Sequence, residues 1–309
     1  MDRIGLSSVG GLMKALVIGV SSYDTLIEID QFPTLKSDVS IWAKNVHYSV
    51  GGTGAGKSLS LDTLGVDTTL VTDLGKDEYR QKILDIYKQT KIHTKVLLAD
   101  VTTTHTNIMY DGGKRLSIFT SMSKEIEFNP KIEDDIQKSE VVFLSINDYC
   151  KHYIPYIKKH DKLCVVDIHD YDIGNPYHQA FIQAADILFA SGVNIDDDIQ
   201  FLKEHIKNKQ LVILTKAEKG SLAIDKNHKI YHQSAFKQLP LLDTNGAGDG
   251  FSAGFIFALL KKKPIQYALA FASVCGAMVC SSRHLFNPDT KENIINKYIQ
   301  IWHNSESGE

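Results

Sequence analysis

The chain has 309 residues, 43% of them hydrophobic and 23% charged, so it can bury one large α/β core or two smaller ones. Its formal net charge of −3, with acidic and basic residues interspersed, lacks the basic stripe that a nucleic-acid binder needs. The four cysteines show no C-x-x-C spacing, and no apolar run approaches the roughly 20 residues of a membrane span. A cytoplasmic protein with small-molecule partners is expected, without nucleic-acid or membrane partners.

The first half of the chain contains two kinds of strand pattern. Residues 1–13 are interpreted as an N-terminal extension, and residues 14–309 as one domain. The apolar run ALVIGV, residues 15–20, predicts a strand buried on both faces. TLIEIDQFP, SIWAKNVHYSV and TNIMYDGGKRLSIFT instead alternate apolar and polar residues, the last around the turn signal Asp111-Gly112-Gly113. Parts of residues 22–50 and 100–122 are therefore predicted to form one small antiparallel sheet.

The remainder alternates strands with helices. TTLVTDLG precedes KDEYRQKILDIYKQT, and VVFLSI precedes YCKHYIPYIKKH. KLCVVDI, AADILFA and QLVILT follow as further strands, an order that predicts a doubly wound, mostly parallel sheet. In VNIDDDIQFLKEHIKN, Asn194 is the expected N-cap, and Asp196–Asp198 place carboxylates in the first turn. A magnesium site built from these three aspartates is the alternative.

The stretch GGTGAGKS, residues 51–58, fits the P-loop pattern G-x-x-x-x-G-K-[ST]. A P-loop would wrap nucleotide phosphates in backbone N–H groups, with Lys57 on the phosphates and Ser58 on magnesium. Such a loop follows a buried parallel strand, whereas NVHYSV is polar and alternating. After the loop, only Leu59 to Gly65 is expected to form a helix, which is under two turns. LCVVD, which ends at Asp167, does fit the apolar strand and aspartate that support magnesium in P-loop proteins. A P-loop NTPase that uses Lys57 is one hypothesis.

A second glycine motif lies in LLDTNGAGDGFSAGFIFALL, residues 241–260. Residues Gly246 to Asp249 are predicted to form the first turn of a long buried helix. The N–H groups of such a turn lack intrahelical partners and make an anion site. Asp249 at that site suits a base that takes the proton of an attacking hydroxyl. In the simpler interpretation, Asp249 is a first-turn acid and the glycines permit close packing.

The combination D-T-x-G-A-G-D resembles the C-terminal signature of the ribokinase-like (pfkB-type) carbohydrate kinases. The resemblance runs from about Lys14 to residue 285. VIGVSSYDTLIEIDQFP is similar to the family's opening strand, whose aspartate, here Asp24, binds sugar hydroxyls. GGTGAGKSLSLDTLG resembles the family segment whose double glycine, here Gly51 and Gly52, approaches the acceptor rather than the nucleotide.

The resemblance implies an ATP-dependent kinase with a ribokinase-like α/β core, a small antiparallel β lid and Asp249 as the catalytic base. It implies Mg²⁺ as a cofactor, a sugar or nucleoside as the acceptor, and a homodimer through the lid. Asp243 is expected either to hold a potassium or sodium ion or to cap the loop. The expected site residues are Asp24, Gly51, Gly52 and Lys57 for the acceptor; Ser191, Thr215 and Gly220 for the nucleotide; and Gly246, Ala247 and Gly248 for the anion hole.

The chain departs from the family pattern in three places. Gly56 replaces an asparagine that contacts the substrate, and Lys57 is expected to reach the same space. Asn194 stands in place of the glutamate of the N-x-x-E pattern that is associated with magnesium, and Ala217 replaces a glycine of T-x-G-x-x-G. A non-catalytic sugar-binding protein is therefore an alternative, although the presence of Asp249 argues against it.

Three further polar residues receive no catalytic assignment. Arg115 on the predicted hairpin is interpreted as a solvated lid residue, with contact to a substrate phosphate as the alternative. His105 and His169 show no metal-ligand spacing and are interpreted as ordinary polar residues. Within the kinase hypothesis, the acceptor can be a sugar, a sugar phosphate or a nucleoside.

Overall fold

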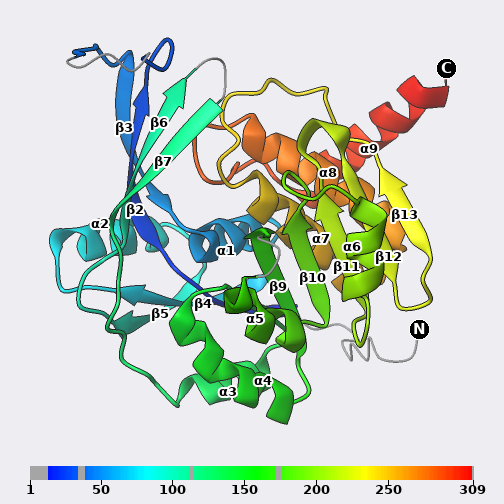
Figure 1. Ribbon diagram of the computed structural model, residues 1–309, viewed down its shortest axis with the longest axis horizontal. Helices are drawn as coiled ribbons and strands as arrows, with labels where there is room; N and C mark the ends of the chain where they lie inside the picture. The colour runs from blue at the N-terminus through cyan, green and yellow to red at the C-terminus, as the bar shows by residue number, and fades with distance from the viewer. Residues whose placement is uncertain (1–12, 34–38, 111–113, 172–174, 308–309) are drawn as a thin grey trace.

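The computed structural model describes residues 13–33, 39–110, 114–171 and 175–307. All but the last residue of the expected N-terminal extension lies outside these ranges, as does the turn Asp111-Gly112-Gly113. The described residues form a nine-stranded sheet in the order β13-β12-β11-β10-β9-β8-β1-β4-β5 (Figure 1). Its strands are β1 (Lys14–Ile18), β4 (Asp67–Leu74), β5 (His93–Leu98), β8 (Val141–Leu144), β9 (Leu163–Asp170), β10 (Ile187–Ser191), β11 (Leu211–Thr215), β12 (Ser221–Asp225) and β13 (Ile230–Gln233).

Neighbouring strands of this sheet run parallel from β5 through β4, β1, β8, β9 and β10 to β11. Strands β12 and β13 then continue the sheet in antiparallel pairs. In β1, Ala15 and Val17 belong to the core on one face of the sheet, and Leu16 and Ile18 to the core on the other. This explains the continuous apolar run, since both faces of the strand are covered. The predicted doubly wound architecture is confirmed.

The helices cover the two faces of the sheet as separate layers (Figure 1). One core contains side chains of α1 (Thr53–Thr63), α2 (Glu78–Tyr87), α7 (Ala247–Leu260), α8 (Ile265–Cys280) and α9 (Glu292–Ser307). The other contains side chains of α3 (Ile132–Lys138), η1 (Asp148–Tyr153), α4 (Ile154–Lys159), α5 (Gln179–Ala184) and α6 (Asp198–His205). The short turns η2 (Pro176–His178) and η3 (Ala217–Lys219) lie in connections.

Four other strands form a second sheet that stands apart from the large one (Figure 1). They are β3 (Asn45–Gly51), β2 (Ser22–Glu28), β6 (Thr104–Tyr110) and β7 (Lys114–Ser121), in that order. The outer pairs β2–β3 and β6–β7 are antiparallel, and the middle pair β2–β6 is parallel. The strands come from the segments that were predicted to alternate, so the small second sheet is confirmed, except that its middle pair is parallel and not antiparallel.

Helix α6 begins later than the sequence pattern predicts. Asn194 lies in a turn, and the N-cap is Asp197, whose Oδ1 accepts a hydrogen bond of 2.9 Å from the Gln200 amide. The Asp198 carboxylate pairs with Lys216, the residue that follows β11. The prediction of Asn194 as the cap is therefore wrong, because the chain offered several capping side chains and Asp197 occupies that position.

Helix α1 begins at Thr53 and is eleven residues long, so the first glycine motif forms its first turns rather than a loop ahead of it. The expectation of a short helix from Leu59 is wrong. The preceding strand β3 pairs antiparallel with β2 in the second sheet. Among the described residues, no helix is both long enough and apolar enough to cross a bilayer.

Candidate active site

Asp24 is a nearly buried carboxylate on β2, with 3% of its surface exposed. Its Oδ1 accepts a hydrogen bond of 2.7 Å from the Ser22 hydroxyl and lies 3.1 Å from Nδ1 of His105. Its Oδ2 accepts a hydrogen bond of 3.1 Å from the amide of Asn107. Any Cβ at Gly51 would collide with this carboxylate, so the glycine leaves room for Asp24. The second sheet thus presents a preorganised polar cluster.

The residues of this cluster share one face of the second sheet. Asp24 pairs with His105 in the register of β2 and β6, and His105 pairs with Phe119 of β7. Paired residues project to the same side of a sheet. Two residues along, Asn107 pairs with Ser117, and their side chains form a hydrogen bond of 2.7 Å. We call this the inner face of the second sheet.

The inner face contacts the second glycine motif. Arg115, on β7, donates a hydrogen bond of 2.6 Å from Nη1 to Oδ1 of Asn245. Asn245 immediately precedes Gly246, the N-cap of α7. Arg115 is exposed, as expected for a solvated lid residue, and it also connects the second sheet to the start of α7.

The start of α7 has the geometry predicted for an anion site. Gly246 has a φ of 76°, and a Cβ there would collide with the carbonyl of Leu285, so only glycine fits. A Cβ at Gly248 would meet no atom within 4 Å. The amides of a first turn have no intrahelical acceptors, although Ala247 N–H donates a hydrogen bond of 3.3 Å to the Thr244 carbonyl. Open space therefore lies beside a helix N-terminus, which favours anions. Asp249 follows in that turn and is 7% exposed.

Lys57 connects the two glycine motifs, which are far apart in the sequence. Its Nζ lies 2.6 Å from Oδ1 of Asp249 and 3.3 Å from Oδ2 of Asp167. Only 4% of the Lys57 side chain is exposed. Lys57 and Asp249 are thus direct partners, and its predicted contact with the acceptor stays a prediction. This geometry does not match a P-loop. The helix that carries Lys57 follows β3 of the second sheet, whereas a P-loop follows a buried parallel strand.

Gly56 explains why Asp249 can approach α1. A Cβ at this position would collide with the Asp249 carboxylate. The position where relatives are expected to have an asparagine is therefore occupied by the partner carboxylate itself. Ser58, the residue that a P-loop would place on magnesium, is fully buried and donates a hydrogen bond of 2.8 Å to the Gly54 carbonyl.

The electrostatics of this cluster are dominated by burial and by the lysine. Burial lowers the pKa of Lys57, but the charges of Asp249 and Asp167 outweigh that effect and raise it overall, so the ammonium stays charged. Burial raises the pKa of Asp249 above its ordinary value, and the charge of Lys57 opposes this rise. Burial favours a higher pKa for Asp167 as well, but the positive charges of His169 and Lys57 outweigh this effect and lower the pKa overall.

The predicted nucleotide residues lie at the ends of neighbouring strands. Ser191 ends β10 and Thr215 ends β11, and the two are direct partners in the register. Gly220, with a φ of 93°, begins the turn back into β12, and a side chain there would collide with the carbonyl of Gln233. In open α/β sheets, ligands bind beyond the carboxyl ends of the parallel strands.

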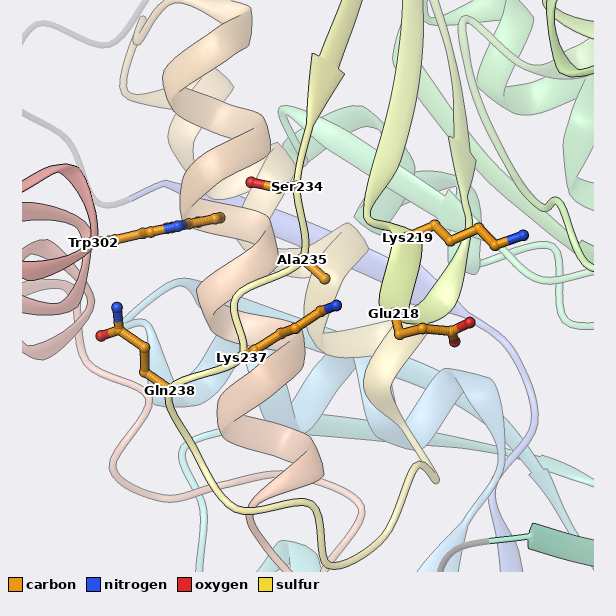
Figure 2. Close-up of a pocket in the computed structure, with 7 residues that line it drawn as sticks. All are labelled: Glu218, Lys219, Ser234, Ala235, Lys237, Gln238 and Trp302. Carbon is orange, nitrogen blue, oxygen red and sulfur yellow. The ribbon is translucent and has the colours of Figure 1, made fainter. Parts of the chain in front are cut away.

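A cavity of about 460 Å³ borders the turn between β11 and β12 that contains Gly220. Figure 2 shows Trp302 extending from α9 toward the segment that follows β13. None of its lining residues belongs to the Asp24 or Asp249 clusters, so the cavity adjoins the predicted nucleotide loop rather than the reacting groups. The lining residues are Glu218, Lys219, Ser234, Ala235, Lys237, Gln238 and Trp302.

Asp243 is 6% exposed, and its Oδ1 accepts a hydrogen bond of 2.8 Å from the Asn245 amide. This contact is the loop cap that the sequence suggested as one alternative. Within the described residues, no group of three or more His, Cys, Asp or Glu side chains is arranged to hold a metal ion.

Sequence reasoning missed two histidines of the site. His105 lies beside Asp24, and His169 places Nδ1 3.4 Å from Oδ1 of Asp167. His169 also has a φ of 51°, which is uncommon for a residue other than glycine. The alternation of THTN predicts that His105 and Asn107 share a face, whereas the spacing of the histidines indicates no metal site. No local signal indicates the contact of His169.

Comparisons with known proteins identify the family of this chain. The sequence pattern of the pfkB family carbohydrate kinases matches residues 14–291. The acarbose 7(IV)-phosphotransferase of an Actinoplanes species is 25% identical over 86% of this chain and 91% of its own length. A nucleoside kinase of Methanothermobacter thermautotrophicus is 26% identical over 93% of this chain and 96% of its own length.

The fold of the chain is also found among solved structures. A microbiome-derived acarbose kinase superposes with a TM-score of 0.84 at 22% identity, covering 94% of this chain and 99% of that one. The match of the family pattern spans most of the sequence and includes both glycine motifs and Asp249. This chain therefore belongs to the pfkB family of carbohydrate kinases.

Proposed function

We propose that this kinase transfers the γ-phosphoryl group of ATP to a hydroxyl of a sugar or sugar-like acceptor, with Asp249 as the general base. The observation that carries the proposal is a buried carboxylate in the first turn of α7, beside the open space at Gly248. The acceptor O–H bond breaks and its proton moves to Asp249, while the oxygen forms a bond to the γ-phosphorus. The electron pair of the broken P–O bond leaves with ADP.

The start of α7 supports the transferred group. Its amides at Gly246, Ala247 and Gly248 would meet the charge that develops on the phosphoryl oxygens. Mg²⁺, when bound to the nucleotide, would neutralise phosphate charge, and it is usually held by phosphates and water with few protein ligands.

The inner face of the second sheet is the proposed acceptor surface. Asp24 and Asn107 offer an acceptor and a donor beside Gly51, a pattern that suits a polyol. The activity of the similar acarbose 7(IV)-phosphotransferase favours a carbohydrate acceptor. A nucleoside, which also carries a ribose diol, is the second candidate, because a nucleoside kinase is similar over most of this chain.

The nucleotide is proposed to bind at Ser191, Thr215 and Gly220, with its base toward the 460 Å³ cavity. Pockets of 300 to 1,000 Å³ are typical for ligands of about this size. Asn194 takes the position of the usual glutamate, so this chain must use other groups around the phosphates. A potassium ion near Asp243 remains a proposal, supported only by the burial of this carboxylate.

The second sheet is proposed to act as a lid and as a dimer surface. Its outer face, opposite Asp24, exposes the apolar side chains of Val46, Tyr48, Leu116 and Ile118. Exposed apolar patches of this kind mark interaction surfaces. Sedimentation equilibrium of the protein and of Ile118→Lys tests the dimer, which should dissociate in the variant.

The test of the proposed function is an ATP-consumption screen of the purified protein against sugars, sugar phosphates and nucleosides, including acarbose, ribose and adenosine. ADP release that requires one of these acceptors, together with a phosphorylated product by mass spectrometry, supports the kinase reaction. Acceptor-independent hydrolysis that Asp249→Asn leaves unchanged would show that the assigned chemistry is incorrect.

A further inference from the structure

Lys57 is the only charged partner within 4 Å of Asp249 among the described residues. It comes from α1, Asp249 comes from α7, and Asp167 comes from β9, so three separate elements meet at one ammonium group. All three side chains are less than 10% exposed. A buried lysine is costly unless it is paired and hydrogen-bonded, and here two carboxylates pair with it.

The contacts divide the two oxygens of Asp249 between two neighbours. Oδ1 accepts the hydrogen bond of 2.6 Å from Lys57. Oδ2 lies on the side of Gly56, where a Cβ would collide with it. Because Gly56 has no side chain, the Asp249 carboxylate fills that space beside the first turn of α1, next to the glycine pair of the predicted acceptor site.

We propose that Lys57 is a positioning residue of this kinase: its ammonium, anchored on Asp167, holds Oδ1 of Asp249 and leaves Oδ2 to accept the proton of the acceptor hydroxyl. The proposal rests on the assignment of Asp249 as the general base. It differs from direct binding of the acceptor by Lys57, because the lysine acts through the carboxylate. The proton and phosphoryl balance is the one given above.

The charges around Asp249 give this role a pH signature. The groups that face it are Lys57 from α1 and Asp167 and His169 from β9. Burial favours the protonated carboxyl, the positive charges of Lys57 and His169 oppose protonation, and Asp167 favours it. Removal of Lys57 should therefore make Asp249 easier to protonate, and removal of Asp167 should make it harder.

The test compares Lys57→Met, Lys57→Arg and Asp167→Asn with the wild-type protein in ATP-Mg²⁺ and whichever of acarbose, ribose or adenosine is turned over. Lys57→Met should lower kcat at neutral pH by about 10-fold or more and move the acid limb of kcat/KM upward by about one pH unit. Asp167→Asn should not move this limb upward. Lys57→Arg should restore much of the rate, because it keeps the charge and the donors.

Loss of Lys57 leaves the buried Asp249 without its cationic partner and leaves Asp167 with His169 alone, so the charge-balanced double variant Lys57→Met/Asp167→Asn serves where the single variant does not fold. Titration of the aspartate carboxyl ¹³C signals provides a readout without any acceptor, with Asp249→Asn identifying the resonance. Because loss of Asp167 alone should lower the Asp249 midpoint, the double variant is compared with Asp167→Asn, relative to which the midpoint should rise. An unchanged midpoint, or a defect confined to the acceptor KM, would overturn the positioning role. If Asp249→Asn itself stays active, the general-base assignment fails instead.

Discussion

Arg115 on β7 and Asn245 before α7 are 130 residues apart, yet their side chains form a hydrogen bond of 2.6 Å. A second contact of the second sheet joins Glu28 of β2 to Arg283, in the segment after α8, at 2.9 Å. Both contacts are largely exposed, so each contributes little to overall stability. Their position suggests that they help to hold the second sheet against the start of α7.

Arg115→Ala should weaken lid closure. A hydrogen bond of this kind contributes about 0.5–1.5 kcal/mol, which corresponds to about a 2- to 10-fold effect. We expect the acceptor KM to rise by that factor and acceptor-independent ATP hydrolysis to increase, because water would enter a looser site. Steady-state kinetics of Lys114→Ala, on the opposite face of β7, provides the control. Identical kinetics for Arg115→Ala and the wild type would rule out a role in closure.

Asp249→Asn should lower kcat by about 100-fold or more while ATP affinity changes little. The amide keeps the shape of the side chain but cannot accept the proton of the acceptor. Turnover is measured by coupled ADP release and ATP affinity by calorimetry. Turnover close to that of the wild type would refute the base assignment, whatever the change in affinity.

Asp24→Ala should chiefly raise the acceptor KM. The substitution removes the carboxylate that Ser22, His105 and Asn107 orient, so the polyol contact is lost while the nucleotide site is untouched. Separate titrations of acceptor and ATP distinguish the two effects. Asp30→Ala, at an exposed position just after β2, is the matched control. A rise confined to the KM for ATP would mean that the inner face does not bind the acceptor.

Gly248→Ala should separate folding from function. A Cβ there meets no atom within 4 Å, so stability in urea should be unchanged or higher by up to about 1 kcal/mol. The added methyl would occupy the space assigned to the phosphoryl group, so turnover should fall. Gly246→Ala, by contrast, should lose roughly 1–2 kcal/mol from the left-handed backbone alone. If Gly248→Ala retains full activity, the phosphate is not bound at this helix start.

Lys57→Met/Asp167→Asn should bind ATP-Mg²⁺ without acceptor about as tightly as the wild type. The lysine contacts Asp249 and Asp167 and follows a strand of the second sheet, whereas a P-loop lysine would bind the outer phosphates. Calorimetric titration of ATP-Mg²⁺ into both proteins measures this directly. Binding that disappears in the variant and survives in Asp167→Asn alone would restore the P-loop interpretation.

The sequence by itself determined the elements whose signals are local. The apolar run of β1, the alternation of the second-sheet strands and the first turn at Gly246 all depend on periodicity or on glycine backbone freedom within a few residues. These signals predicted the doubly wound core, the small sheet and the position of Asp249. The prediction of Asn194 as the N-cap was wrong because several capping side chains lie close together in the sequence, and local preference does not rank them reliably.

Only the tertiary structure decided which polar side chains meet. Lys57 pairs with Asp167 and Asp249, which lie 110 and 192 positions further along the sequence. His105 reaches Asp24 because β2 and β6, which come from distant segments, are neighbouring strands. Such partners depend on how α1, α7 and β9 pack against one another. The GKS sequence could therefore suggest a nucleotide lysine, whereas burial and the absence of a side chain at Gly56 bring that lysine against Asp249.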